Sequence, residues 1–276
     1  MQRFVPPPCD LQPWLEGAVV VDSPAELPGS QFPAMVGSML VVRLEGEVLR
    51  GGAALPAAAW ISASTVATAY VHHGRVRAVG LMLRPEMVPS LLATGRGVVN
   101  GVRPMATMAG PSWVLAEQAI RAARDDDARI GALWQFVRHE RATQLQCEER
   151  LVRARALLDH AGTGAQGTAS RSGVGLRQFE RRFVAEWGMT PKQFQVIARF
   201  SATLLHAMDA PTEPGAHLAA DQGYYDQSHM ARDMRRLAGQ PLQGLVQEAA
   251  QSSPSAHWPL QVGARAHQAA VSLRSR

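Results

Sequence analysis

The chain has very few cysteines and no long apolar run. Cys9 and Cys147 are the only cysteines among 276 residues, too few for a disulfide framework or a four-thiolate zinc site. We therefore expect reduced thiols in a cytoplasmic protein. No apolar run approaches the ~18–20 residues of a membrane span, and the first residues lack the apolar centre of a secretory signal. The sequence thus predicts no membrane partner.

The sequence also lacks the short motifs of common enzyme classes. It contains no P-loop, no G-x-G-x-x-G before a helix and no G-x-S-x-G nucleophile elbow. The adjacent His72 and His73 cannot chelate one metal together, because neighbouring residues on a strand point to opposite faces. We expect structural or exposed histidines here. We predict no catalytic residue, no metal and no cofactor.

Net charge gives only a weak indication of nucleic-acid binding. The chain carries a formal charge of +5, but residues 143–249 hold twelve Lys and Arg against eleven Asp and Glu. The three basic residues of 250–276 face no acidic residue in that segment. An argument for DNA must therefore depend on where the charges lie. The 46% hydrophobic content is ample for a folded core, which excludes global disorder.

Hydrophobic periodicity divides the chain into a β-rich first part and a helical second part. Aliphatic runs at 34–49, 65–71 and 75–83 are bounded by Gly and Pro, which predicts short strands of an antiparallel sandwich or barrel. From Pro85 onward, apolar residues recur three and four apart, as in helices. The acidic triplet Asp125–Asp127 separates two of these helical stretches.

We therefore predict an α+β protein, with an antiparallel β domain followed by an all-α domain. The all-α domain would contain two helix-turn-helix units joined by a long helix. The predicted divisions are a β domain at 1–110, a helical linker at 111–145, a DNA-binding domain at 146–249, and a basic, mostly disordered tail at 250–276.

The first helix-turn-helix unit lies in GVGLRQFERRFVAEWGMTP, residues 173–191. Apolar residues at spacings of three and four predict a core-facing stripe on a helix over 176–187, formed by Leu176, Phe179, Phe183 and Trp187. The exposed side carries the candidate DNA-binding residues Arg177, Gln178, Glu180, Arg181 and Arg182. Arg177 and Arg181 are i,i+4 neighbours that could reach guanine or phosphates in a major groove. A solvated amphipathic face with an Arg182–Glu186 pair is the alternative.

The second unit lies in LAADQGYYDQSHMARDMRRLAGQP, residues 218–241. Asp226 is suited to cap a helix, and Gly223 stands where the preceding helix must turn. Met230, Met234 and Leu237 would then point inward. The outer side carries further candidate DNA-binding residues, with Asp233 beside them: Gln227, Ser228, His229, Arg232, Arg235 and Arg236. Polar residues in the first turn followed by Arg are typical of a recognition helix.

A long apolar stretch joins the two units. Residues 190–208 have apolar side chains on more than one side, which predicts a helix buried between two subdomains. Nineteen helical residues span about 28 Å, close to the ~34 Å between successive major-groove faces on one side of B-DNA. This length suits the placement of two recognition helices in adjacent major-groove segments.

The two units together resemble the AraC/XylS family of bacterial transcription regulators. The resemblance covers roughly 147–249, and its most specific residues are Gly223, Tyr224, Asp226, Gln227, Ser228, Arg232, Arg235, Gly239 and Pro241. It implies a cytoplasmic, nucleoid-associated regulator without enzymatic activity, which binds double-stranded DNA. It also implies a cupin-like N-terminal domain and allows three further partners: RNA polymerase, an unidentified small-molecule effector, and a second copy bound through the N-terminal domain.

One segment departs from the family pattern. Four glycines in 161–173 disfavour a helix by ~1 kcal/mol each relative to Ala, where the family has the helix that supports the first recognition helix. This departure and the near-neutral charge keep an alternative function open. The protein could instead be a small-molecule-binding or enzymatic β-domain protein with a degenerate, non-binding helix-turn-helix domain.

Overall fold

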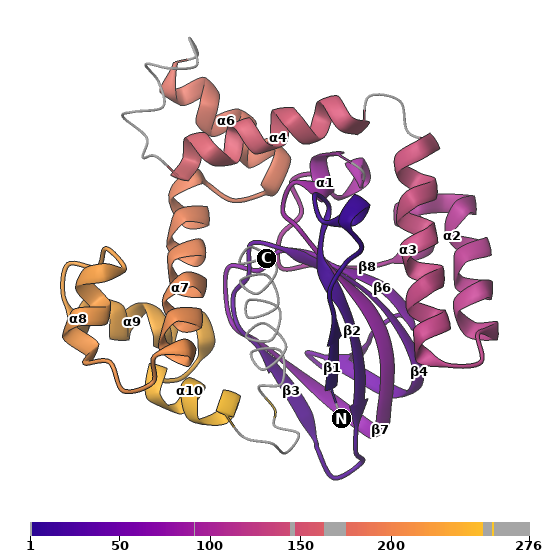
Figure 1. Cartoon of the computed structure of the whole chain (residues 1–276), viewed down its shortest axis with the longest axis horizontal. Helices are drawn as coiled ribbons and strands as arrows, with labels where there is room; N and C mark the ends of the chain where they lie inside the picture. The colour runs from indigo at the N-terminus through magenta and orange to yellow at the C-terminus, as the bar shows by residue number, and fades with distance from the viewer. Residues whose placement is uncertain (1, 91, 144–146, 163–174, 251–255, 257–276) are drawn as a thin grey trace.

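The computed structural model describes residues 2–90, 92–143, 147–162, 175–250 and 256. An antiparallel β domain forms the N-terminal part, and helices form the C-terminal part (Figure 1). This is the α+β order that the sequence predicts. The predicted tail at 250–276, except Ala250 and Ala256, lies outside the described residues. So does the glycine-rich stretch at 161–173, apart from its first two residues.

Eight described strands form one antiparallel sheet. Their order is β1-β2-β7-β4-β6-β8, with β3 paired to β7 and β5 paired to β4. The strands are β1 (Gln2–Val5), β2 (Leu15–Ser23), β3 (Gly29–Phe32), β4 (Ser38–Arg50), β5 (Ala53–Ala54), β6 (Ala58–Ile61), β7 (Thr68–Leu83) and β8 (Val102–Pro104).

Two of the strands predicted from the sequence are one strand. The runs at 65–71 and 75–83 both fall in β7, apart from residues 65–67. Gly74 looks like a break in the sequence, but β4 pairs with β7 on both sides of it, from Ser38↔Leu83 to Leu49↔Val71. Register shifts in β4 around Glu45 accommodate the irregularity. Cross-strand pairing therefore overrides the local turn signal.

The helical pair α2 (Met105–Ala122) and α3 (Asp126–Thr143) covers one face of the sheet (Figure 1). Helix α2 is kinked at Gly110, directly before Pro111. The break predicted at the acidic triplet is confirmed, because Asp125 Oδ1 accepts a hydrogen bond of 2.8 Å from the Ala128 amide at the start of α3. Buried tryptophans dominate the core between helices and sheet: Trp14, Trp60 and Trp113.

The periodicity that begins at Pro85 forms only short helical pieces before α2. These are α1 (Met87–Ser90) and the 3-10 turn η2 (Ala93–Gly95), and an earlier 3-10 turn, η1, spans Cys9–Leu11. Residues 96–101 then lead from η2 back to the sheet, where β8 begins at Val102. Arg96 Nη2 holds this segment by donating a 2.8 Å hydrogen bond to the Pro89 carbonyl.

The C-terminal helices pack around a second core. They are α4 (Cys147–Gly162), α6 (Leu176–Trp187), α7 (Pro191–Asp209), α8 (Gly215–Asp221), α9 (Gln227–Ala238) and α10 (Leu242–Ala250). Phe183, Phe200, Met234 and Leu237 are fully buried within this core. Helix α7 runs between α6 at its first end and α8–α10 at its second (Figure 1). No helix among the described residues is long and apolar enough to span a membrane.

Candidate nucleic-acid interface

Helix α6 has the bounds that the sequence predicts, Leu176–Trp187, and begins after Gly175. Phe179, Phe183 and Trp187 are buried, and their rings stack in sequence, with centroids 5.9 and 4.6 Å apart. The prediction for Leu176 is wrong, since it is 37% exposed. Leu176 lies one turn before the aromatic cluster and is not part of it.

The side of α6 opposite these aromatic rings is open to solvent. All five candidate residues on it are exposed: Arg177, Gln178, Glu180, Arg181 and Arg182. The alternative pair Arg182–Glu186 does not form. Glu186 Oε2 instead lies 3.1 Å from Nε of Arg96, in the segment between η2 and β8. The Arg182 side chain is therefore not held by an acid one turn away.

Helix α9 begins directly after Asp226, as predicted, and ends at Ala238. Asp226 Oδ1 accepts a 2.6 Å hydrogen bond from the His229 amide, and Gly223 and Gly239 take positive φ angles of 70° and 81°. Met230, Met234 and Leu237 are buried. Five of the six candidates on α9 are exposed and the sixth, His229, is half-buried: Gln227, Ser228, His229, Arg232, Arg235 and Arg236.

The position of Asp233 differs from the sequence prediction, which places it beside the outward residues. It is only 7% exposed. Its carboxylate lies against Arg199 of α7 and Arg236 of its own helix, at 3.3 and 2.9 Å. The periodicity of α9 alone could not reveal this, because Arg199 is 34 positions away in the sequence.

Helix α7 joins the two candidate helices over 19 residues. Thr190 and Gln193 form a reciprocal capping box at its start, with hydrogen bonds of 3.2 and 2.8 Å. Ile197, Phe200 and Leu204 are buried. The predicted long buried helix is therefore confirmed, and it is rigidly capped where it follows α6.

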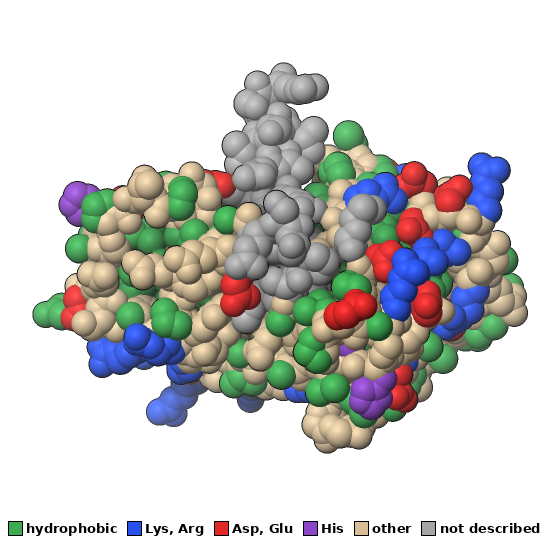
Figure 2. Space-filling view, turned by 90° about the horizontal axis from the view of Figure 1, so that it is seen from below, with side chains coloured by type: hydrophobic (Ala, Val, Ile, Leu, Met, Phe, Trp, Pro, Cys, Tyr) green, Lys and Arg blue, Asp and Glu red, His purple; other side chains and the backbone are tan. Residues whose placement is uncertain are grey.

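Basic side chains are unevenly distributed over the surface. Figure 2 shows Lys and Arg side chains gathered along one edge of the helical region, whereas on the β-domain side they are interspersed with Asp and Glu. The near-neutral sum over 143–249 therefore conceals a local separation of charge. Such a separation attracts phosphates more strongly than the net charge suggests.

Sequence reasoning missed two exposed residues at the starts of these helices. Tyr225, directly before the Asp226 cap, is 93% exposed. An apolar residue at that position often packs against the first turn of its helix, whereas here Tyr224 is the buried tyrosine. Lys192, in the first turn of α7, is also exposed. The predicted Asp226 cap was the signal that could have pointed to Tyr225, and Thr190 at the start of α7 is a comparable signal for Lys192.

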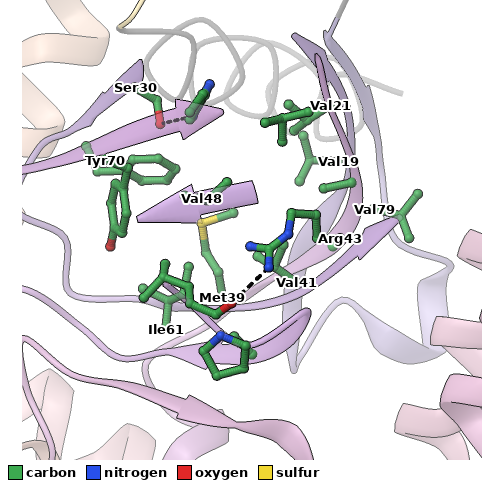
Figure 3. Close-up of a pocket in the computed structure, with 18 residues that line it drawn as sticks. Val19, Val21, Ser30, Met39, Val41, Arg43, Val48, Ile61, Tyr70 and Val79 are labelled. Atoms are coloured by element: carbon green, nitrogen blue, oxygen red, sulfur yellow. Dashed lines mark hydrogen bonds between the residues drawn. The ribbon is translucent and has the colours of Figure 1, made fainter. Parts of the chain in front are cut away.

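The β domain contains a cavity of about 80 Å³. Figure 3 shows Arg43, Met39 and Val48 directed into it, with Ser30 near its other end. Met39 lines this cavity and Met35 lines a smaller one beside it, while Trp14 and Trp60 belong to the core.

The two adjacent histidines have opposite environments, as predicted. His72 is buried beside the cavity, where its Nε2 lies 3.1 Å from Ser30 Oγ, and burial lowers its pKa. Its Nδ1 has no hydrogen-bond partner among the described residues. His73 is exposed and pairs with Glu47 at 3.1 Å. Within the described ranges, no cluster of three or more His, Cys, Asp or Glu side chains could hold a metal.

Both candidate helices end against the β domain. Near the end of α6, the Glu186 carbonyl accepts a 3.2 Å hydrogen bond from Gly97, and Trp187 Nε1 donates a 2.9 Å bond to the Pro85 carbonyl. At the end of α9, the Leu237 carbonyl accepts a 2.7 Å bond from the Ala34 amide. The β domain therefore anchors the last turns of both helices, while their basic faces stay exposed to solvent.

Part of the chain matches a known family of domains. Residues 168–247 match a family model described as a helix-turn-helix domain. No curated protein matches the chain. Among solved structures, ToxT from Vibrio cholerae superposes with a TM-score of 0.46 and 6% identity, covering 83% of this chain and 97% of that one.

Two ligand-bound structures of ToxT give similar values. The complex with (E)-4-(8-methylnaphthalen-1-yl)but-3-enoic acid has a TM-score of 0.47 and 5% identity, covering 82% of this chain and 96% of that one. The unsaturated fatty acid complex has a TM-score of 0.46 and 7% identity, covering 82% and 93%.

The helix-turn-helix pair α8–α9 and the helix α6, joined by the buried helix α7, have the arrangement of a DNA-binding domain. The matched domain is of the AraC type. The protein is a DNA-binding transcriptional regulator, of a class that acts by binding DNA and not by catalysis.

Proposed function

We propose that the chain reads operator DNA by inserting α6 and α9 into successive major-groove segments. The observation that carries this proposal is the exposure of one basic face on each helix, at the two ends of the buried helix α7. The 19 residues of α7 span about 28 Å, against ~34 Å between successive major-groove faces. The helices α6 and α9 extend beyond the two ends of α7, which makes up the remaining distance between the groove segments.

The exposed residues divide into two roles. Arg181 and Arg232 lie centrally on their faces, where a guanidinium can contact guanine O6 and N7 with two hydrogen bonds. The remaining proposed groove-facing residues are Arg177, Gln178, Glu180, Gln227, Ser228 and His229. Arg182 and Arg235 lie to the side and are proposed to contact phosphates, which fixes register and carries most of the salt dependence. Arg236, next to Arg235 on α9, is held by Asp233.

The test is selection of DNA from a random pool by the full chain, followed by binding measurements over a range of salt concentrations. A reading of two major-groove segments predicts a selected site with two conserved blocks about one helical turn apart. The apparent affinity should fall linearly with the logarithm of salt concentration. The alternative function, a β domain with a non-binding helical domain, predicts no enriched sequence and only weak binding. That outcome would contradict the proposal.

We also propose that a small molecule occupies the β-domain cavity. Two observations support it: the apolar walls enclose Arg43, whose guanidinium donates to the Leu55 carbonyl at 2.8 Å, and the buried Nδ1 of His72 lacks a partner among the described residues. Arg43 forms no ion pair within the described part of the chain. A cavity of about 80 Å³ has room for roughly six water-sized groups, which suits a small ring with one polar substituent.

Binding of benzene, phenol and benzoate, followed by NMR shifts of the cavity methyl groups, tests this site. Phenol or benzoate should bind more tightly than benzene if Arg43 and His72 recognise a polar substituent. Ala78→Phe, which fills the cavity, is the control and should abolish the shifts. Equal shifts in the filled variant would contradict the proposed site.

We also propose two protein partners for the chain. A second copy would bind through the N-terminal domain, and RNA polymerase would contact the DNA-bound chain. A regulator with these partners would act in the cytoplasm at the nucleoid. Sedimentation of the full chain with and without its selected DNA distinguishes a dimer from a monomer that binds two groove segments alone.

A further inference from the structure

Asp233 lies where α7, α9 and the turn before α9 meet. Its Oδ1 accepts a 2.9 Å hydrogen bond from Arg236, one turn further along α9. Its Oδ2 lies 3.3 Å from Nη2 of Arg199 and 3.9 Å from Nε2 of His229. One buried carboxylate therefore contacts two side chains on the DNA-facing helix and one on the connecting helix.

Arg199 fixes this carboxylate from the α7 side. Its guanidinium lies 4.2 Å over the ring of Tyr224 and donates a 3.2 Å hydrogen bond to the Gly223 carbonyl. Both of these residues belong to the turn that precedes α9. Because Arg199 belongs to α7 and its planar guanidinium contacts both the turn and Asp233 of α9, it connects all three elements. Asp233 therefore contacts Arg199 through Oδ2, which leaves Oδ1 to contact Arg236.

Arg236 and Arg235 form a natural comparison. They are adjacent on α9 and both are exposed, but only Arg236 is paired with Asp233. Arg235 has no acidic partner among the described residues. The Arg236 side chain is still 56% exposed, so its remaining N–H donors can reach DNA. An Arg held in one orientation loses less conformational freedom on binding and discriminates geometry better than a free one.

We propose that Asp233 is a positioning residue for DNA recognition, holding Arg236 in one orientation so that it discriminates between sequences. The carboxylate also offsets one positive charge beside the DNA, which weakens binding to unrelated sequences. This inference depends on the proposed function of α9 as a recognition helix. It assigns Arg236 a different role from that of its neighbour Arg235.

The first test needs no DNA. NMR relaxation of the arginine Nε–H groups in the full chain should show Arg236 more ordered than Arg235. Asp233→Asn should make Arg236 as mobile as Arg235, while Asp221→Asn should change neither. Asp221 is an exposed acid on α8 in the same domain, so this control removes the same charge. Equal mobility of the two arginines in the unaltered chain would overturn the proposal.

The second test measures affinity for selected and unrelated DNA over a range of salt concentrations. Asp233→Asn should tighten binding to unrelated DNA and lower the ratio of specific to non-specific affinity by roughly tenfold, the order of one good base contact. The released Arg236 should steepen the salt slope by about one unit. Asp221→Asn should leave the ratio unchanged.

A double-mutant cycle with Arg236→Gln separates positioning from support of the fold. Arg236→Gln leaves the Asp233–Arg199 pair in place. If Asp233 acts through Arg236, Asp233→Asn should not change the affinity ratio further in that background. An undiminished effect there, or an equal loss of both affinities with a lower melting temperature, would overturn the inference. A wild-type chain that does not discriminate among sequences would instead contradict the function proposed for α9.

Discussion

The backbone amide of Ala34, in the β domain, donates a 2.7 Å hydrogen bond to the carbonyl of Leu237, in the last turn of α9. Ala34 is buried in the core of the helical region, although it belongs to the β domain. Phe32, two residues earlier, lines the β-domain cavity. A short stretch of main chain thus connects the cavity wall to the end of the second candidate recognition helix.

We expect Ala34→Leu to loosen this connection. Ala34 is 1% exposed, and extra methyl groups in a packed interior typically destabilise by about 1–3 kcal/mol. Hydrogen exchange of the α9 amides in the free protein should become faster, most of all near Leu237. Ala106→Leu, at an exposed position of α2, is the matched control. Unchanged exchange at α9 would mean that the β domain does not support this helix.

Replacing Arg181 or Arg232, at the centres of the two exposed faces, should affect DNA binding differently from replacing Arg235, at the side of α9. Arg181→Ala and Arg232→Ala should each lower the ratio of specific to non-specific affinity, by about 1–3 kcal/mol of discrimination. Arg235→Ala should weaken binding to all sequences alike and reduce the salt slope by about one unit. Binding titrations on selected and scrambled DNA measure both. A variant that keeps the wild-type ratio has lost no base contact.

Gly188 and Gly239 follow the two candidate recognition helices in the same left-handed conformation, with φ of 69° and 81°. A Cβ at Gly188 would lie 2.5 Å from the carbonyl oxygen of Gly97, whereas at Gly239 the nearest atom is 4.0 Å away. Both Ala variants should cost about 1 kcal/mol for the positive φ. Gly188→Ala should lower the melting temperature further, because the segment at Gly97 must move. An equal decrease in melting temperature for the two variants would show that the segment at Gly97 moves away from the added Cβ at no cost in stability.

His72 is expected to make stability depend on pH. Burial lowers the pKa of His72 below its ordinary value of 6.5, so the unfolded chain binds a proton more readily than the folded one. The contribution of His72 to the free energy of unfolding is therefore fully present above pH 6.5 and is lost as the pH falls below that value. Denaturant unfolding between pH 7.5 and 5 should show this decline, and His72→Gln should flatten it. His73→Gln, which alters the exposed neighbour, should leave the decline in place.

Local signals in the sequence determined the helices that carry the candidate interface. The bounds of α6, the Asp226 cap of α9 and the capped start of α7 all depend on residues within four positions of one another. Side-chain caps and stripes of apolar residues act at that range. A change of hydrophobic period near Pro85 likewise indicated a β-rich part followed by a helical part, although the sheet continues past it to β8.

Only the tertiary structure decided how distant residues meet. The pairing of β4 with β7 made one strand from two predicted ones, and Arg96 displaced Arg182 as the partner of Glu186. The burial of Asp233 depends on Arg199, on another helix. The energies of these contacts depend on geometry between segments far apart in the chain, which periodicity along a single segment does not contain. The sequence therefore specified which helices present basic faces, and the packing of the two domains specified which of their arginines are held and which are free.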